Sequence, residues 1–252
     1  MSSERLVGSA PPGRAPQRPA CATTEYVQVL EQYLAPELQA LVPFFGRPQR
    51  LAVLATQLDR HFVPGAGSPA QRDVLDVGCG PLATEYFLPQ LHGHAVLAVD
   101  YTPAFAAVHA ALQQRGHLVG VDFAVGDADS HDFGKRRFDL ILMHDLLYEP
   151  ALSFARLLPK YDRLLRHGGL LYLTVQDVRT RWIWRLLRRE KAHVRYDVGQ
   201  VRAQLQAAGY EVLDTLPASL HTHEGVNQAF QQLLWRGFGL ANQVAIMARK
   251  RG

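Results

Sequence analysis

The stretch Val74-Leu75-Asp76-Val77-Gly78-Cys79-Gly80-Pro81-Leu82 decides the fold of this 252-residue chain. A short apolar run carries one acidic residue and then breaks into a glycine-rich turn, after which the residues up to Leu88 read as the start of a helix. A buried parallel strand followed by such a turn lets the backbone come close to a bound nucleotide. We therefore expect a nucleotide-like ligand at this turn.

Strand and helix patterns alternate from residue 72 onward. The strands are continuous apolar runs, which is typical of a sheet buried on both faces and predicts a doubly wound, Rossmann-like α/β fold. One predicted helix has Thr102 as its cap, Pro103 in its first turn and Gly116 as its end, and another ends at Gly168-Gly169. The predicted strands are Val74–Val77, Ala95–Val99, Val121–Val125, Leu140–Met143, Leu170–Val175, Tyr210–Leu216 and Val244–Arg249.

The chain divides into three predicted segments. Residues 1–20 are rich in Ser, Gly, Pro and Arg and are expected to form a disordered tail. Residues 21–70 carry apolar side chains at helical spacing, with Thr23 or Thr24 as a helix cap, and predict an N-terminal helical cap. Residues 71–252 hold the strands and form the ligand-binding domain.

Composition narrows the class of protein. Two cysteines, Cys21 and Cys79, make no disulfide framework, which favours a reducing compartment and a cytoplasmic location. No apolar run reaches the ~20 residues that cross a bilayer, so no membrane partner is expected. The net charge is only +4, and no dense basic tract interleaved with aromatic residues interrupts the core of the chain, so nucleic acid is an unlikely partner.

Acidic residues at the strand ends indicate which nucleotide is bound. Asp100 follows the second strand and can accept hydrogen bonds from both hydroxyls of a ribose. The spacing Gly78-x-Gly80-x-x-Ala83 with Asp100 also fits a dinucleotide. Asp76 favours S-adenosylmethionine instead, because a carboxylate two residues before Gly78 suits the cationic methionyl part of that cofactor and not a pyrophosphate.

Together these residues resemble the class I S-adenosylmethionine-dependent methyltransferases of the small-molecule type, over residues 72–250. The resemblance rests on Asp76–Gly80, Val96–Asp100, Gly126–Ala128, Phe138–His144 and the segment 165–173. It implies a seven-stranded sheet whose last strand is antiparallel, and S-adenosylmethionine as the cofactor. The family often has a third glycine where this chain has Leu82, which puts the local shape of the turn in question. The cofactor-binding residues expected from the motifs are Asp76, Gly78, Cys79, Gly80, Asp100, Tyr101, Asp127, Ala128 and His144.

The segment after the fourth strand indicates which class of acceptor is methylated. Relatives that methylate amino groups of nucleic-acid bases have an Asn/Asp-Pro-Pro-aromatic tetrad there, whereas this chain reads His144-Asp145-Leu146-Leu147. We therefore expect a small-molecule oxygen or nitrogen acceptor, and the oligomeric state is left open, with a homodimer as one option.

His144 and Asp145 are the candidate catalytic residues. A histidine with a pKa near ~6.5 suits proton abstraction from a hydroxyl acceptor, and the alternative is that His144 merely lines the cofactor pocket. The candidate substrate-binding residues are Tyr26, Tyr33, Tyr148, Glu149, His221 and His223.

Two further patterns have simpler interpretations. His221-Thr222-His223-Glu224 is more typical of a polar loop than of metal ligands, so no metal site is expected. The basic run 179–191 is interpreted as an amphipathic helix with a solvated face, with Trp182 or Trp184 packed near the pocket.

Three other functions stay open from the sequence. The same cofactor supports a non-methyl outcome, such as cyclisation of its aminobutyryl arm. A nicotinamide oxidoreductase fits the glycine spacing, and a catalytically silent partner subunit of the same fold fits every motif.

Overall fold

The seven predicted strands form one sheet in the computed structural model, which describes residues 20–62, 71–186, 193–218 and 226–252. The strand order is β3-β2-β1-β4-β5-β7-β6, and β7 runs antiparallel to both of its neighbours. This confirms the Rossmann-like doubly wound fold with an antiparallel last strand. The strands are β1 Asp73–Val77, β2 Ala95–Asp100, β3 Val121–Val125, β4 Phe138–Met143, β5 Leu165–Gln176, β6 Tyr210–Pro217 and β7 Gln243–Lys250.

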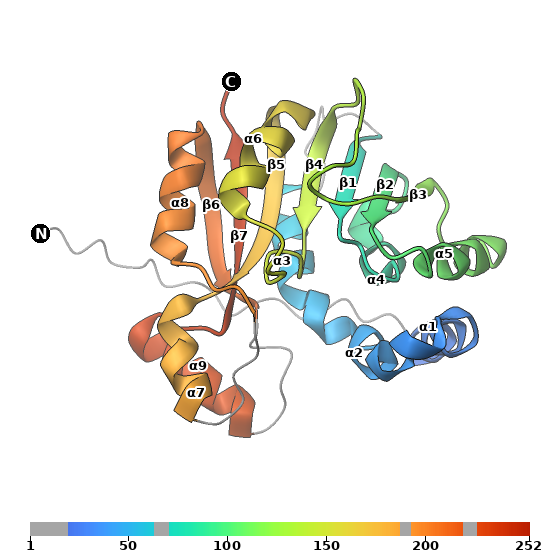
Figure 1. The fold of residues 1–252 in the computed structure, drawn as a ribbon, viewed down its shortest axis with the longest axis horizontal. Coiled ribbons are helices and arrows are strands. Elements are labelled where there is room, and N and C mark those ends of the chain that lie inside the picture. Colours follow the sequence, from blue (N-terminus) through green and yellow to red (C-terminus); the bar gives the residue numbers. More distant parts are fainter. Residues whose placement is uncertain (1–19, 63–70, 187–192, 219–225) are drawn as a thin grey trace, which may run out of the picture.

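Helices cover both faces of the sheet (Figure 1). The α-helices are α1 Ala20–Tyr33, α2 Val42–Phe45, α3 Ala52–His61, α4 Ala83–Phe87, α5 Phe105–Gln114, α6 Phe154–Leu164, α7 Arg181–Leu186, α8 Val198–Ala207 and α9 Val226–Phe238. Short 3-10 helices are η1 Pro36–Leu41, η2 Pro48–Leu51, η3 Pro89–Leu91 and η4 Val178–Thr180. None of the described helices is long and apolar enough to cross a membrane.

Two apolar clusters hold the layers together. On one face α6 and α8 pack against the sheet through buried residues such as Leu157 and Leu205. On the other face α3, α4, α5 and the N-terminal segment share one cluster with the strands, and Tyr26 and Leu54 are fully buried in it. The predicted helical cap therefore shares the core of the sheet. The predicted bounds of the helical cap, residues 21–70, and of the ligand-binding domain, residues 71–252, stay predictions.

Three helix ends differ from the sequence prediction in the residues that cap or end them. Helix α1 begins at Ala20, so Thr23 and Thr24 lie inside the helix and do not cap it. Helix α5 begins at Phe105, because Thr102 and Pro103 form the turn before it, where the Phe105 amide donates to the Thr102 carbonyl (3.2 Å).

The third difference concerns the glycines after α6. The helix ends at Leu164 and β5 starts at once, with Leu165 paired to Phe138, so the helix stops before the glycines expected to end it. The register then shifts, and Leu170 pairs with Leu140. The glycines thus lie in an irregular stretch of the strand itself.

The topology fixes where a ligand binds. Strand β1 pairs in parallel with β2 on one side and β4 on the other, so the crossovers leave it in opposite directions. A crevice opens at such a switch point, beyond the carboxyl ends of the strands. The segments that follow β1, β2 and β4 all meet there.

Candidate active site

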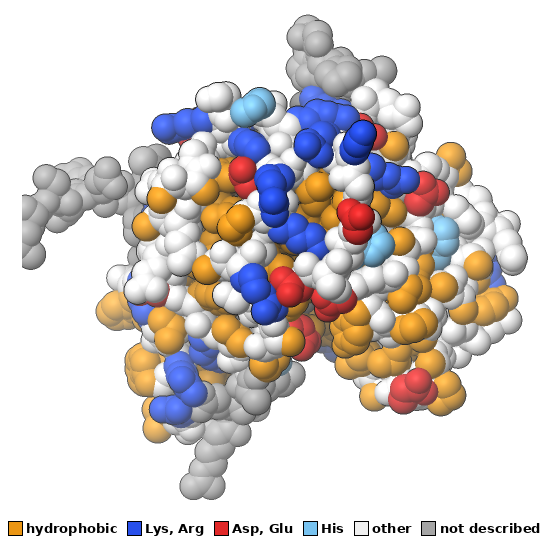
Figure 2. Space-filling view, turned by 45° about the horizontal axis from the view of Figure 1, so that its top comes forward, with side chains coloured by type: hydrophobic (Ala, Val, Ile, Leu, Met, Phe, Trp, Pro, Cys, Tyr) orange, Lys and Arg blue, Asp and Glu red, His pale blue; other side chains and the backbone are white. Residues whose placement is uncertain are grey.

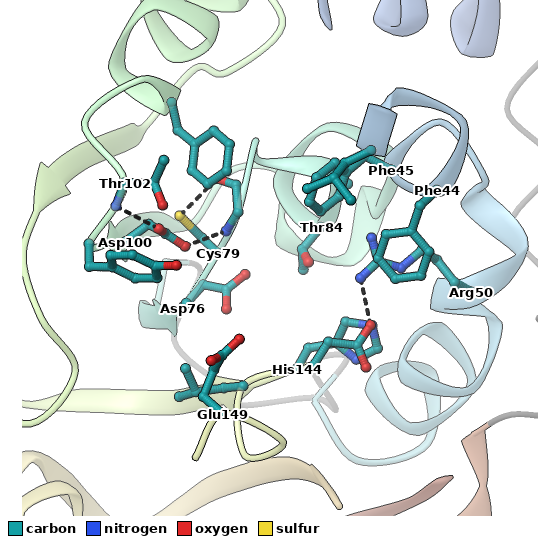
Figure 3. A pocket seen from close by; sticks show the side chains of 18 of the residues that line it. Phe44, Phe45, Arg50, Asp76, Cys79, Thr84, Asp100, Thr102, His144 and Glu149 are labelled. Carbon is teal, nitrogen blue, oxygen red and sulfur yellow. Dashed lines mark hydrogen bonds and ion pairs between the residues drawn. The ribbon is translucent and has the colours of Figure 1, made fainter. Parts of the chain in front are cut away.

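A cavity of about 220 Å³ lies at this switch point, between the N-terminal helices and the carboxyl ends of β1, β2 and β4. Figure 3 shows Asp76 in its middle, Asp100 and Thr102 on one side, and Thr84, Arg50 and His144 on the other. The lining residues are Leu38, Leu41, Phe44, Phe45, Arg50, Leu51, Asp76, Gly78, Cys79, Gly80, Ala83, Thr84, Asp100, Tyr101, Thr102, Phe105, His144, Asp145, Leu146, Tyr148 and Glu149.

The glycine turn after β1 forms the floor of the cavity. Gly78 has φ +70°, and a Cβ atom there would lie 2.7 Å from Leu146 Cδ1, so the position needs glycine on both counts. Gly80 has φ +59°, and Phe45 from the N-terminal cap lies 3.4 Å from where its Cβ would be. The turn is therefore covered by the cap on the side opposite β1.

Leu82 adopts the backbone conformation that the family's third glycine would supply. Its φ and ψ are 63° and 31°, in the left-handed region, and its side chain is fully buried. The turn thus keeps its shape with a leucine, at a conformational strain of roughly 1–2 kcal/mol. The departure noted in the sequence leaves the turn intact.

Asp100 ties the second strand to the glycine turn. Its two carboxylate oxygens accept hydrogen bonds from the Gly80 amide (3.0 Å) and the Thr102 amide (2.9 Å). This fixes the carboxylate at the rim of the cavity, beside Tyr101, whose side chain is exposed. The remaining lone pairs of both oxygens are available to ribose hydroxyls.

Asp76 is the unusual group of the site. It is 1% exposed, and neither carboxylate oxygen has a hydrogen-bond partner among the described residues. Burial raises the pKa of Asp76 to about 7, and the charge of Asp100 adds to the shift. Buried carboxylates are nearly always paired, so Asp76 is built to meet a cationic donor that enters the cavity.

Glu85 lies behind this group, on α4. It is buried beside Asp76, and burial together with the charge of Asp76 raises its pKa well above the usual range. Burial and the charge of Asp76 both favour the protonated form of Glu85, so Asp76 is the member of the pair that holds the charge when a cation is bound.

His144 and Asp145 follow β4 and both line the cavity. The Nδ1 atom of His144 lies 3.3 Å from the Tyr172 hydroxyl, and its Nε2 lies 3.4 Å from an Asp145 carboxylate oxygen without a formal hydrogen bond. Burial lowers the pKa of His144, which Asp145 partly opposes. The imidazole is thus neutral at pH 7 and able to accept a proton.

Asp145 is held from three directions. Its carboxylate forms an ion pair with Arg50 Nη2 (2.6 Å) and accepts a hydrogen bond from Gln243 Nε2, and its amide donates to Thr174 Oγ1 (2.8 Å). Its φ of +52° is in the left-handed region, which Asp tolerates better than most residues. Although burial alone would raise it, two neighbours keep the pKa of Asp145 far below its usual range: His144, which is protonated at the low pH where a carboxyl titrates, and the Arg50 guanidinium. Asp145 is therefore a fixed anion and no proton donor.

Arg50 comes from the N-terminal cap and closes the cavity on the side of His144 and Asp145. Its guanidinium carbon lies 4.1 Å from the centre of the Phe44 ring and 5.5 Å from that of Phe45. Figure 3 shows the guanidinium directed at the carboxylate beside His144. The sequence prediction missed Arg50, since its partner Asp145 lies 95 residues away and no local motif marks it.

The structure brings most predicted cofactor residues to the cavity. Asp76, Gly78, Cys79, Gly80, Asp100, Tyr101 and His144 all line it. Burial raises the pKa of the Cys79 thiol, so this cysteine stays neutral and fills space.

Asp127 and Ala128 do not line the cavity. The Asp127 carboxylate accepts hydrogen bonds from the Asp129 and Ser130 amides, and the Ala128 carbonyl accepts one from Tyr161 Oη (2.7 Å). Both residues are thus occupied in shaping the turn after β3, and contact with an adenine stays a prediction for them.

Of the predicted substrate-binding residues, Tyr148 and Glu149 line the cavity, and burial raises the pKa of Tyr148 to about 12. Tyr26 is placed in the core instead, where its hydroxyl donates to the Pro81 carbonyl (2.8 Å), and Tyr33 lies away from the cavity at the end of α1. The Tyr33 ring is 37% exposed and lies 5.8 Å from the guanidinium carbon of Arg115, and substrate contact stays a prediction for both tyrosines. His221 and His223 lie outside the described residues.

Comparisons with known proteins agree with this geometry. Residues 74–169 match a family model described as a methyltransferase domain. A probable phthiotriol/phenolphthiotriol dimycocerosates methyltransferase 2 of Mycobacterium ulcerans is 35% identical over 107 residues, which cover 42% of this chain and 39% of that protein. The match thus spans about two fifths of this curated relative.

Solved structures share the fold at low identity. The N-methyltransferase NodS of Bradyrhizobium japonicum, in complex with S-adenosylhomocysteine, has a TM-score of 0.56 and 19% identity over 90% of this chain and 99% of that chain. The [4+2]-cyclase SpnF has a TM-score of 0.58 and 21% identity over 81% of each chain. The family model over residues 74–169 and the shared fold confirm the resemblance to the class I, S-adenosylmethionine-dependent methyltransferases that was drawn from the motifs.

Proposed function

We propose that this protein is an S-adenosylmethionine-dependent methyltransferase that acts on an oxygen or nitrogen atom of a small molecule. The observation that carries the proposal is the Asp76 carboxylate, buried and unpaired beside a glycine turn. A cationic ligand with a ribose satisfies Asp76 and Asp100 together, whereas the pyrophosphate of a nicotinamide cofactor would be repelled by Asp76.

The comparisons support the same cofactor. The family model is that of a methyltransferase domain, and the NodS structure contains S-adenosylhomocysteine. The curated relatives are named as methyltransferases of phthiotriol and phenolphthiotriol dimycocerosates, which favours an acceptor outside nucleic acid and protein.

When bound, S-adenosylmethionine supplies a methyl group already activated by its sulfonium. The chain then has to position the acceptor and exclude water, and for well-oriented partners this contributes up to ~7–11 kcal/mol. Phe44, Phe45 and Arg50 enclose the cavity from the cap side, and Tyr148 and Glu149 from the β4 side. We propose these residues as the acceptor contacts.

His144 is the proposed general base for a hydroxyl acceptor. Its imidazole is buried at the cavity wall and neutral at pH 7, and Asp145 beside it is an anion that stabilises the imidazolium once the proton has moved. Arg50 and Gln243 hold that carboxylate in place. An unprotonated amine acceptor would need no base.

Product analysis separates methyl transfer from the alternatives. Methyl transfer yields S-adenosylhomocysteine, whereas displacement within the aminobutyryl arm yields methylthioadenosine. Because a protein named as a [4+2]-cyclase has the same fold, fold similarity alone does not make this distinction.

Calorimetric titration with S-adenosylmethionine tests the cofactor assignment. The wild-type protein should bind it, and Asp76→Asn should bind it roughly 10- to 100-fold more weakly, because a charge-assisted hydrogen bond is lost. Asp122→Asn is the matched control, since Asp122 is exposed on β3 and away from the cavity. Binding of NAD(P) without binding of S-adenosylmethionine would overturn the proposal.

A further inference from the structure

Glu85 on α4 is a buried acidic residue that has no role in the chemistry proposed so far. It is 1% exposed and lies beside Asp76, which lines the cavity, whereas Glu85 itself does not. The ion pairs formed by the described residues include neither of the two carboxyl groups. Since an unpaired buried charge is costly, this arrangement requires an explanation.

The other acidic residue of β1 is treated in the ordinary way. Asp73, at the start of the strand, forms an ion pair with Arg166 (2.7 Å), which also pairs with Asp139 (2.6 Å). Figure 2 shows acidic and basic side chains next to one another on the face turned forward, at the end of the molecule where β1 and β4 begin. At the opposite end of β1, Asp76 has a second carboxyl group as its neighbour and no ion-pair partner among the described residues.

The surroundings of the two carboxyl groups do not balance their charge. Arg50 acts on Asp76, but its guanidinium is already paired with Asp145 (2.6 Å). The Asp100 carboxylate adds a further negative charge near Asp76. The other titratable groups around the pair are the thiol of Cys79 and the hydroxyls of Tyr26 and Tyr172. Burial raises the pKa of each of these three groups, so they stay neutral.

A proton allows the two carboxyl groups to lie together. Two ionised carboxylates have only acceptor atoms and repel each other, so a hydrogen bond between them needs a proton on one. Burial and the charge of Asp76 raise the pKa of Glu85 well above its usual range, whereas the pKa of Asp76 is about 7. Glu85 is therefore the group that retains the proton, and Asp76 is the group that a cation in the cavity can reach.

We propose that Glu85 is a positioning residue for the cofactor: it keeps its proton and donates a hydrogen bond to Asp76, and Asp76 loses its own proton to solvent when the cofactor's ammonium group binds. The pair then presents a single negative charge to the cavity. Both S-adenosylmethionine and S-adenosylhomocysteine have this ammonium group, so both should bind more tightly as the pH rises toward neutrality. The inference rests on the proposed cofactor.

Calorimetric titration of the full chain with S-adenosylhomocysteine tests the coupling to a proton. Because the group that loses the proton has a pKa of about 7, affinity should be about eightfold weaker at pH 6 than at pH 7.5. Titrations at pH 6 in two buffers of different ionisation enthalpy should show release of roughly 0.9 proton per bound ligand. Asp76→Asn should bind weakly, with neither proton release nor dependence on pH.

Two substitutions of Glu85 separate its hydrogen bond from its size. Glu85→Gln keeps a donor, so its affinity at pH 7.5 should lie within about threefold of wild type and should depend on pH in the same way. Glu85→Leu has no donor and should bind about tenfold more weakly at pH 7.5, because the ionised form of Asp76 loses a hydrogen bond. Glu211→Gln is the matched control, since Glu211 is exposed on β6 outside the cavity.

Infrared difference spectroscopy gives a second readout that a purely structural role would not affect. The ligand-bound protein should retain the band of a protonated carboxyl group, and Glu85→Gln should lack it. Equal affinity at pH 6 and pH 7.5 would overturn the inference and leave the proposed function standing. So would a shift of the pH dependence to lower pH in Glu85→Gln, which is expected if Glu85 is ionised. Absence of binding at every pH would overturn the cofactor assignment, and this inference with it.

Discussion

Asp76 combines ligand recognition with a cost in stability. In the unfolded chain its pKa is near ~3.9, and in the folded protein it is about 7. Between these values the folded state keeps a proton that the unfolded state has lost, so the free energy of unfolding falls as the pH rises from about 4 to 7. Above pH 7 no further loss from this group is expected.

Asp76→Asn should therefore stabilise the ligand-free protein while it weakens cofactor binding. At pH 8 we expect a gain in the free energy of unfolding on the order of 4 kcal/mol, measured by urea denaturation. At pH 5 the gain should be smaller, because wild-type Asp76 is then protonated. A variant that is less stable than wild type at pH 8 would contradict this account of the buried carboxylate.

His144 distinguishes an oxygen acceptor from a nitrogen acceptor. His144→Gln should lower kcat about 10²- to 10⁴-fold if the acceptor is a hydroxyl, with little change in cofactor affinity. Because burial lowers the pKa of His144, wild-type kcat should stay level at pH 6.5 and fall only at lower pH. His167→Gln is the control, since His167 is exposed on β5 outside the cavity. Full activity of His144→Gln would show that His144 is not the general base and would favour an amine as the acceptor.

Leu82 provides a test of strain in the glycine turn. Both Leu82→Ala and Leu82→Gly lose a fully buried side chain, but only glycine adopts φ +63° without a steric penalty. We expect Leu82→Gly to be more stable than Leu82→Ala by about 1 kcal/mol in urea denaturation.

The matched controls are Leu54→Ala and Leu54→Gly, because Leu54 is equally buried but lies within α3. There the order should reverse, with glycine about 1 kcal/mol less stable than alanine. The same order at both positions would mean that the turn is unstrained.

At the level of elements, the Arg50–Asp145 ion pair joins η2 of the cap to the segment after β4. The two side chains are only 9% and 16% exposed, so removal of one partner leaves a buried charge. Arg50→Met should lower the free energy of unfolding by about 3–5 kcal/mol, and Arg50→Met with Asp145→Asn should lower it less. A double-mutant cycle in urea measures this coupling, and strictly additive losses would contradict it.

The elements also show what the sequence can predict. All seven strands were predicted near their observed positions, because buried parallel strands are continuous apolar runs bounded by turns. The glycine turn, Asp76 and Asp100 were predicted because they follow consecutive strands and form a local motif. The cap packs over the glycine turn and so brings Arg50, Phe44 and Phe45 to the site. No local sequence motif predicts this packing. Tyr26 lies in the core and does not line the cavity, and sequence alone does not separate these two positions for an aromatic residue on a cap helix.

At the scale of the whole molecule, the cap and the sheet share one apolar cluster that runs from Tyr26 through Leu54 to Leu140. The Tyr26 hydroxyl also holds the Pro81 carbonyl of the glycine turn. We therefore expect the protein to unfold in a single transition, with equal calorimetric and van't Hoff enthalpies. S-adenosylhomocysteine at a hundred times its Kd should add about 2.7 kcal/mol to the free energy of unfolding and raise the one Tm by about 5–11 °C. Differential scanning calorimetry with and without the ligand measures both quantities. Two resolved transitions, of which only one moves with ligand, would show that cap and sheet fold separately and that the cap is not part of the cofactor site.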